Sequence, residues 1–345
     1  MNRSKRYNIK DVAKKADVSI STVSHALNDT RYVKAETKSK IKKVAEQLNY
    51  RPSTIATGLR RKTLKTIAVF VANIESQFFA KVLKGINRVA LTNDYHTIMV
   101  NTFYDQIEEE KVVEKLKNQF IDGAVFVSGF DNKGCIQKLS QDRFPFVLVA
   151  RKISRGFPSI LVDNFKALRE AVCYLYGLGH RDIGYLTMDY RGRNTVSERF
   201  EGYMQGLKDI GISYNPEKVL IGGSRMIDEM EEGYLVCMKQ FRQKKVPKAL
   251  IAATDNLAAG AYTALKEIGL RIPGDVSVIG FDNLPLSKFL DPPLSTVKQP
   301  KEEMGACAMN MLLDLMEGNE IKNKWVLLDT KIIERGSVSE VKNRG

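Results

Sequence analysis

From Thr66 onward, the chain alternates short apolar runs with stretches in which apolar residues recur at helical spacing. Recurrence three and four positions apart is the pattern of an amphipathic helix; one such set is Phe79, Val82, Leu83 and Ile86. Strands that alternate with helices predict βαβ units and parallel sheets. Because the pattern occurs twice, we expect an α/β fold with two similar subdomains. The expected strands are residues 67–72, 96–101, 123–128, 146–150, 159–162, 183–187, 219–221, 249–253 and 276–280.

Before this region, residues 9–28 contain two short helical patterns that meet at a tight turn. Ser19 stands where the second helix begins, and its side-chain oxygen can accept a hydrogen bond from the first turn. Asp17 occupies the turn, and aspartate tolerates a left-handed backbone better than most residues. A third pattern over residues 34–49 predicts a helix that covers the first two. The apolar faces expected to pack together are Val12, Ala13 and Ala16, then Val23, Ala26 and Leu27, then Ile41, Val44, Ala45 and Leu48.

The second helix of this pair is typical of a reading helix for the major groove of DNA. Its outward side chains are short and mostly able to form hydrogen bonds, and base edges in that groove are read by such bonds. The alternative is an ordinary helical hairpin on a protein surface. We expect base contacts from Ile20, Ser21 and His25, a phosphate contact from Thr22, and an outward position for Ser24.

The net charge of +14 lies almost entirely on this amino-terminal segment. Residues 1–66 contain 17 lysines and arginines against 5 acidic residues, whereas the remaining residues contain 37 against 35. A basic segment can be no more than a solvated tail. Here the basic residues are interleaved with amphipathic helices, which favours contact with the phosphates of double-stranded DNA.

Length and composition limit the remaining classes. A chain of 345 residues predicts two or three domains. No apolar run reaches the roughly 20 residues of a membrane span, and the start, MNRSKRYNIK, lacks the apolar stretch of a secretory signal. We therefore expect a cytoplasmic, nucleoid-associated protein without a membrane partner. No cofactor, metal site or disulfide framework is indicated, because the cysteines are scattered singly at Cys135, Cys173, Cys237 and Cys307.

Several motifs resemble the lac repressor/galactose repressor family. The run DVAKKADVSISTVSHALN and the following VKAETKSKIKKVAEQLNYRPSTIATGL are similar to its amino-terminal region, most of all to that of the purine repressors. Further matching motifs are LGHRDIGYL, ERFEGY, IPGDVSVIGFDN and PPLSTVKQP, so the resemblance covers nearly the whole chain. It implies an all-α helix-turn-helix headpiece and a periplasmic-binding-protein-like core of doubly wound parallel sheets, with three chain crossings between the subdomains.

The resemblance also implies a role for the segment that joins headpiece and core. In the family this hinge folds when two copies meet on the operator. Ala56 would pack in the minor groove, and Leu59 would be the wedge that unstacks a base step and kinks the DNA. The alternative is a flexible basic linker. The expected domains are a headpiece of residues 1–49, a hinge of 50–65, a first core subdomain of 66–163 with about 295–327, and a second of 164–294 with about 328–341.

A ligand site is expected between the two core subdomains. Ligands of open parallel sheets bind beyond the carboxyl ends of the strands. Acidic residues follow three of the expected strands, at Asp163, Asp255 and Asp282. The loops after the first strand of each half, residues 73–79 and 188–197, are further candidates.

The resemblance adds roles to single positions. Asp255, Asp282 and Arg199 stand where sugar-binding relatives contact hydroxyl groups, and charge-assisted hydrogen bonds suit such ligands. Aromatic faces suit a base or a sugar ring; the positions where purine-binding relatives enclose the base hold Phe78, Phe79, Arg193 and Thr195. Structural roles are the alternatives: Arg199 could pair with Glu198 or Glu201, Asp255 could cap a helix, Asp282 could close a turn, and Phe79 could belong to the core.

Together these features predict a ligand-responsive transcription regulator, in the first place a repressor, that binds a near-palindromic operator as a homodimer. A sugar or sugar derivative is the expected effector, and a purine is the second choice. Whether the ligand releases or tightens DNA binding, and whether a protein coregulator takes part, stays open. The rival class is a two-lobed α/β enzyme for a small polar substrate, but the sequence contains no GxSxG, P-loop or HExxH motif.

Overall fold

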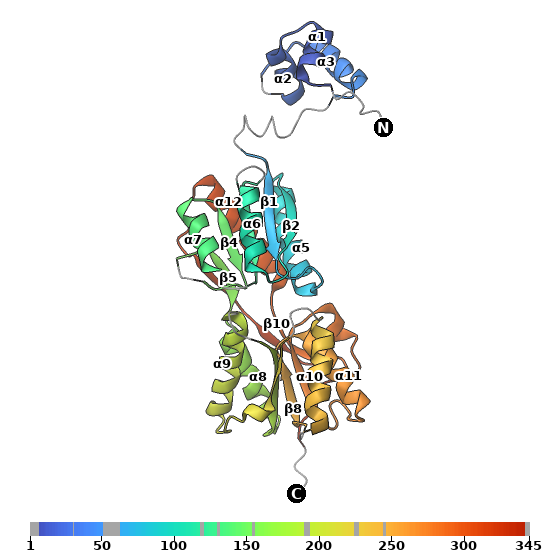
Figure 1. Cartoon of the computed structure of the whole chain (residues 1–345), viewed down its shortest axis with the longest axis vertical. Coiled ribbons are helices and arrows are strands. Elements are labelled where there is room, and N and C mark those ends of the chain that lie inside the picture. The colour runs from blue at the N-terminus through green and yellow to red at the C-terminus, as the bar shows by residue number, and fades with distance from the viewer. Residues whose placement is uncertain are drawn as a thin grey trace. The chain divides into compact units, whose positions relative to one another are not determined.

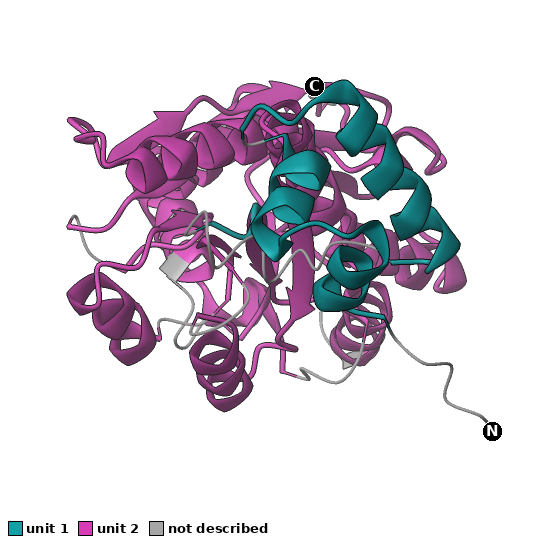
Figure 2. Cartoon of the chain, turned by 90° about the horizontal axis from the view of Figure 1, so that it is seen from above, with its two compact units in different colours: residues 1–65 teal, residues 66–345 magenta. Residues whose placement is uncertain are grey.

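The computed structural model describes residues 7–29, 31–50, 63–117, 121–129, 132–153, 156–189, 194–223, 228–243 and 246–341. The chain divides into two compact units, Met1–Lys65 and Thr66–Gly345 (Figure 2). Each unit has its own buried apolar core. Ala56 and Leu59 of the expected hinge, and Arg193 of the expected ligand site, lie outside the described residues.

In its described part, the first unit is built from α1 (Ile9–Ala16), α2 (Ile20–Asn28) and α3 (Ala35–Gln47). Ser19 caps α2, because its side chain accepts a hydrogen bond from the amide of Thr22 at 3.1 Å. Asp17 ends α1 with a φ of 55°, in the left-handed region. The apolar residues predicted for the three helices are buried in one cluster or packed against it, which confirms the predicted pattern.

The second unit contains two sheets of six strands (Figure 1). In the first sheet every pairing is parallel, and the order is β11-β5-β4-β3-β1-β2. Ile67 and Val69 of β1 enter the core on one face, whereas Ala68 and Phe70 enter the core on the other. The elements are β1 (Thr66–Val71), α5 (Gln77–Thr92), β2 (His96–Asn101), α6 (Gln106–Lys117), β3 (Gly123–Val127), α7 (Lys133–Gln141), β4 (Phe146–Val149), β5 (Ser159–Val162), α12 (Lys301–Glu317) and β11 (Trp325–Leu328).

The second sheet has the order β12-β10-β9-β8-β6-β7. Its pairings are parallel except at one edge, where β12 runs antiparallel to β10. The elements are α8 (Asn164–Gly177), β6 (Ile183–Met188), α9 (Asn194–Asp209), η1 (Pro216–Lys218), β7 (Val219–Gly222), α10 (Glu229–Gln243), β8 (Ala249–Ala252), α11 (Asp255–Glu267), β9 (Ser277–Asp282), η2 (Pro285–Lys288), β10 (Ser295–Lys298) and β12 (Lys331–Ile333).

Three late strands, β10, β11 and β12, are missing from the sequence prediction. The chain enters the second sheet after β5, returns to the first through α12, and comes back with β12. β10 lies in the second sheet, whereas the sequence assigned residues from about 295 to the first subdomain. The sheets are parallel as expected except at β12, which runs antiparallel to β10. This strand arrives directly from β11 of the other sheet, so no crossover helix on its own sheet sets its direction.

Candidate ligand cleft and DNA-reading helix

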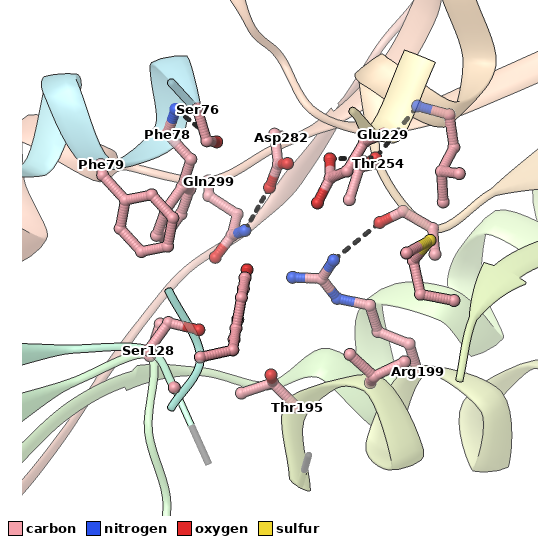
Figure 3. Close-up of a pocket in the computed structure, with 17 residues that line it drawn as sticks. Ser76, Phe78, Phe79, Ser128, Thr195, Arg199, Glu229, Thr254, Asp282 and Gln299 are labelled. Atoms are coloured by element: carbon pink, nitrogen blue, oxygen red, sulfur yellow. Dashed lines mark hydrogen bonds between the residues drawn. The ribbon is translucent and has the colours of Figure 1, made fainter. Parts of the chain in front are cut away.

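A cleft lies between the two sheets, at the carboxyl ends of their strands (Figure 3). The first subdomain provides the start of α5 and the residues that follow β2, β3 and β4. The second provides residues from α9, α10 and the ends of β8, β9 and β10. The lining residues are Ser76, Phe78, Phe79, Tyr104, Ser128, Gly129, Ala150, Met188, Thr195, Val196, Arg199, Glu229, Ala253, Thr254, Leu257, Asp282 and Gln299.

Arg199 of α9 is the buried cation of this cleft. Its Nε donates to Asn164 Oδ1 at 2.9 Å, and its Nη1 donates to the backbone oxygen of Ala253 at 2.7 Å. The guanidinium lies 3.8 Å from the centroid of the Phe281 ring. These contacts hold the side chain in one orientation, with its end pointing toward the middle of the cleft (Figure 3).

Asp282 ends β9 in the left-handed region, with a φ of 111°. Its carboxylate accepts a hydrogen bond from Gln299 Nε2 at 2.5 Å, and Lys301 donates to its backbone oxygen. Burial raises the pKa of Asp282 above its ordinary value, and the positive charges of Arg199 and Lys301 oppose that shift. A carboxylate and a guanidinium therefore face the same cleft.

The other two acidic candidates lie outside the cleft lining. Asp255 is fully buried and accepts hydrogen bonds, each 2.6 Å long, from the amide of Leu284 and the hydroxyls of Ser287 and Thr296. Burial raises its pKa to about 7, and the nearby charge of Asp282 adds to the shift. Asp163 is exposed and caps α8 by accepting from the amide of Lys166. Of the three aspartates that the strand-end rule proposed for the cleft, only Asp282 lines it, and the structure gives Asp255 and Asp163 structural roles.

The apolar side of the cleft comes from α5. Phe78 and Phe79 meet edge to face, with ring centroids 5.5 Å apart and an angle of 87° between the rings. Thr195 and Arg199 lie on the opposite side in Figure 3. Phe79 belongs to the apolar core and also lines the cleft.

Several lining residues were not predicted from the sequence, above all Glu229, Gln299 and Tyr104. The Glu229 carboxylate accepts from Thr254 Oγ1 at 3.1 Å and from Asn256 Nδ2 at 3.3 Å. Gln299 directly follows β10, and because that strand was not predicted, the strand-end rule could not find it. Tyr104 follows β2 and could have been found by the same rule.

The exposed face of α2 carries most of the predicted DNA-reading residues. Ile20 and Ser21 are exposed, whereas Thr22 and His25 are half-buried. The hydroxyl of Ser19 lies 2.7 Å from that of Ser21 and 2.8 Å from that of Thr22. Ser24 is buried, with 7% exposure, so its expected outward position is wrong. It stands beside Val23 on the side of α2 that faces the other helices.

Two kinds of feature are absent from the part of the chain that the structure describes. No group of three or more His, Cys, Asp or Glu side chains there could hold a metal ion. No helix there is both long enough and apolar enough to span a membrane.

Comparison with known proteins decides the family. Residues 8–53 match the family description "Bacterial regulatory proteins, lacI family", and residues 172–338 match "Periplasmic binding protein-like domain". The transcriptional regulator RegA of Clostridium acetobutylicum is 35% identical over 333 residues, which cover 95% of this chain and 98% of that protein. The chain belongs to the LacI family. The transcriptional repressor PurR of Pectobacterium atrosepticum is 33% identical, over 96% of this chain and 97% of that protein.

The solved structures agree with membership of the LacI family. The lac repressor dimer bound to operator and the anti-inducer ONPF matches with a TM-score of 0.83 and 26% identity, over 97% of this chain and 100% of that one. These relatives regulate transcription, and none of them is an enzyme. The chain is therefore a DNA-binding transcription regulator, and the enzyme alternative has no support.

Proposed function

We propose that this LacI-family regulator is a repressor that binds a near-palindromic operator as a homodimer, with its DNA affinity set by a small molecule in the cleft. The cleft itself carries the proposal, because polar groups of the second subdomain face aromatic groups of the first across it. A ligand that contacts both sides favours one angle between the subdomains over another. That angle sets the spacing of the two hinge segments, and so couples the ligand site to the DNA site.

A neutral sugar or sugar derivative is the effector class that the lining fits first. Arg199 offers donors, while Asp282 and Glu229 offer carboxylate acceptors, and a sugar hydroxyl can both donate and accept. Additional hydroxyl groups come from Ser76, Ser128, Thr195 and Thr254. The Phe78 ring can cover the apolar face of a sugar ring.

A purine base is the second candidate, and a specific observation favours it. Phe78 and Phe79 form an edge-to-face pair at the cleft, and such a pair can stack on or enclose a flat base. The 33% identity to PurR extends over nearly the whole chain, including this region. The two classes differ in what they require of Asp282 and Glu229, since a base presents few hydroxyl groups.

A thermal-shift screen of the full chain tests the effector class. The panel holds sugars, phosphosugars, nucleosides and purine bases. A ligand at about a hundred times its Kd stabilises the folded state by roughly 2.7 kcal/mol, which shifts the melting temperature measurably. Arg199→Gln and Asp282→Asn should reduce the shift caused by a hit. Asp163→Asn is the matched control, since Asp163 is an exposed helix cap outside the cleft; equal losses in all three variants would contradict the assigned site.

The DNA half of the proposal has its own test. Operator selection with the full chain should yield a near-palindromic site, bound as a dimer. We assign base contacts to Ile20, Ser21 and His25 and a phosphate contact to Thr22, because these residues stand on the accessible side of α2. By resemblance, Leu59→Ala should weaken binding strongly without unfolding the core. An unchanged affinity of that variant would remove the wedge role.

A further inference from the structure

An ion pair joins the two subdomains beside the cleft. Lys152 follows β4 of the first subdomain, and its Nζ donates to Glu198 Oε1 of α9 in the second subdomain at 2.6 Å. The same ammonium lies 5.6 Å from the centroid of the Trp325 ring on β11. Lys152 therefore contacts an aromatic ring of its own subdomain and a carboxylate of the other.

The second carboxylate oxygen of Glu198 connects the ion pair to Arg199 in the ligand site through two hydrogen bonds. Glu198 Oε2 accepts a hydrogen bond from Asn164 Nδ2 at 3.3 Å, and Asn164 Oδ1 accepts one from Arg199 Nε at 2.9 Å. Asn164 is buried and begins α8, where the chain first crosses between the subdomains. A chain of contacts thus runs from Trp325 through Lys152, Glu198 and Asn164 to the guanidinium in the cleft.

We propose that Lys152 and Glu198 form a latch that holds the two subdomains in this arrangement and, through Asn164, positions Arg199 for the effector. The role in effector binding rests on the proposed function, whereas the latch itself does not. Neither residue lines the cleft, so both are positioning residues and not ligand contacts.

The latch acts on the free-energy difference between two arrangements of the subdomains. The two side chains are 42% and 21% exposed, and an exposed ion pair contributes little to stability. To favour one arrangement of the subdomains, this pair needs only to form in that arrangement and to break in the other. Any contact with that property shifts the equilibrium between the arrangements, and with it the affinity of a ligand that prefers one of them.

The only tryptophan of the chain gives a readout that needs no effector. The nearby ammonium affects the emission of Trp325, so releasing Lys152 should change that emission. In the ligand-free full chain, we expect Glu198→Gln to change the emission intensity and maximum. Asp182→Asn is the matched control, because it breaks the Lys218–Asp182 ion pair of 2.7 Å, which lies within the second subdomain. An emission spectrum of Glu198→Gln identical to that of the wild type would overturn the latch.

Affinity measurements test the coupling, with D-ribose and hypoxanthine as probes for the two effector classes. If the wild type binds a probe, Glu198→Gln and Lys152→Gln should each weaken that binding about fivefold, while Asp182→Asn should leave it unchanged. The exchange of both charges, Lys152→Glu with Glu198→Lys, should restore the ion pair but only part of the affinity, because a lysine at position 198 cannot accept the hydrogen bond from Asn164 Nδ2. Equal affinities in all variants would overturn the positioning role. If the wild type binds neither probe, the effector proposal fails for them, and the Trp325 emission still tests the contact between Lys152 and Glu198.

Discussion

Arg151 and Glu109 form a two-point ion pair inside the first subdomain, with Nη1–Oε2 at 2.9 Å and Nη2–Oε1 at 3.0 Å. Their side chains are only 1% and 7% exposed. The pair lies next to the cleft. Ala150 and Gly129 line the cleft, and a Cβ added at Gly129 would lie 3.7 Å from Arg151 Nη1 and 3.8 Å from Glu109 Oε2. The sequence did not predict this pair. Arg151 follows an apolar strand, and a basic residue in that place gives no sign that it is buried.

Breaking this pair should destabilise the protein. Glu109→Gln leaves the Arg151 charge buried without a compensating carboxylate, and we expect a loss of about 3 kcal/mol in the free energy of unfolding. Replacing both residues together, by Glu109→Leu with Arg151→Met, should cost less, because no buried charge is left. Urea unfolding followed by circular dichroism measures both. Lys111→Gln, which breaks the exposed Lys111–Glu108 pair, is the control; a similar small effect of Glu109→Gln would contradict the buried-charge argument.

Gly305 should be required for the close packing of α12 on α5. A Cβ at this position would lie 2.0 Å from the backbone oxygen of Val82, and backbone atoms cannot move aside cheaply. We expect Gly305→Ala to lower the free energy of unfolding by at least about 2 kcal/mol. Gly134→Ala in α7 meets no atom within 4 Å and should instead raise it, by about 0.5 kcal/mol. Parallel urea titrations compare the two, and equal effects would show that α12 can shift away.

Asp255 predicts a pH dependence of stability with a definite sign. Its pKa is raised to about 7 from its ordinary value of 3.8, chiefly by burial, so the folded state binds its proton more tightly than the unfolded state. The contribution of this group is therefore most favourable below about pH 4, declines as the pH rises toward 7, and is constant above that.

The comparison with Asp255→Asn isolates this group from the others that titrate. Between pH 4.5 and 7.5, the wild type should lose stability relative to the variant by roughly 3 kcal/mol, since each pKa unit corresponds to about 1.4 kcal/mol. Urea unfolding at several pH values gives this difference. A constant difference across the range would show that Asp255 titrates normally in the folded protein.

Two of the missed strands, β11 and β12, differ physically from the buried strands that the sequence predicted. β1, β3 and β8 are apolar over nearly their whole length because both faces of the sheet are covered by helices, and such runs are visible in a sequence. β11 has no fully buried residue, and β12 has only three residues. Both exist because a strand of an already formed sheet is available as a partner, which no local pattern encodes.

The site shows a similar limit. A topological rule indicated Asp282 and the loops that contain Phe78, Phe79 and Thr195, and the family resemblance added Arg199. All five residues line the cleft. The rule says where a residue lies but not which way its side chain turns. Asp255 turns into the protein toward Ser287 and Thr296, and Ser24 turns into the headpiece, and neither direction follows from the residue's position along its helix.

Ser21 and Ser24 provide a matched pair of variants for the DNA-reading role of α2. Both are serines on the same helix, but Ser21 is exposed and Ser24 is buried. If Ser21 contacts a base edge, Ser21→Ala should lower the ratio of operator binding to non-specific binding by about tenfold, because one hydrogen bond to a base is lost. Ser19 would still cap α2 through the amide of Thr22, so the headpiece should stay folded.

Ser24→Ala should change thermal stability and leave the ratio of operator binding to non-specific binding unchanged. Fluorescence anisotropy with the selected operator and a scrambled duplex, at one fixed salt concentration, measures both ratios. A lower ratio for Ser24→Ala together with an unchanged ratio for Ser21→Ala would reverse the assignment of the reading face.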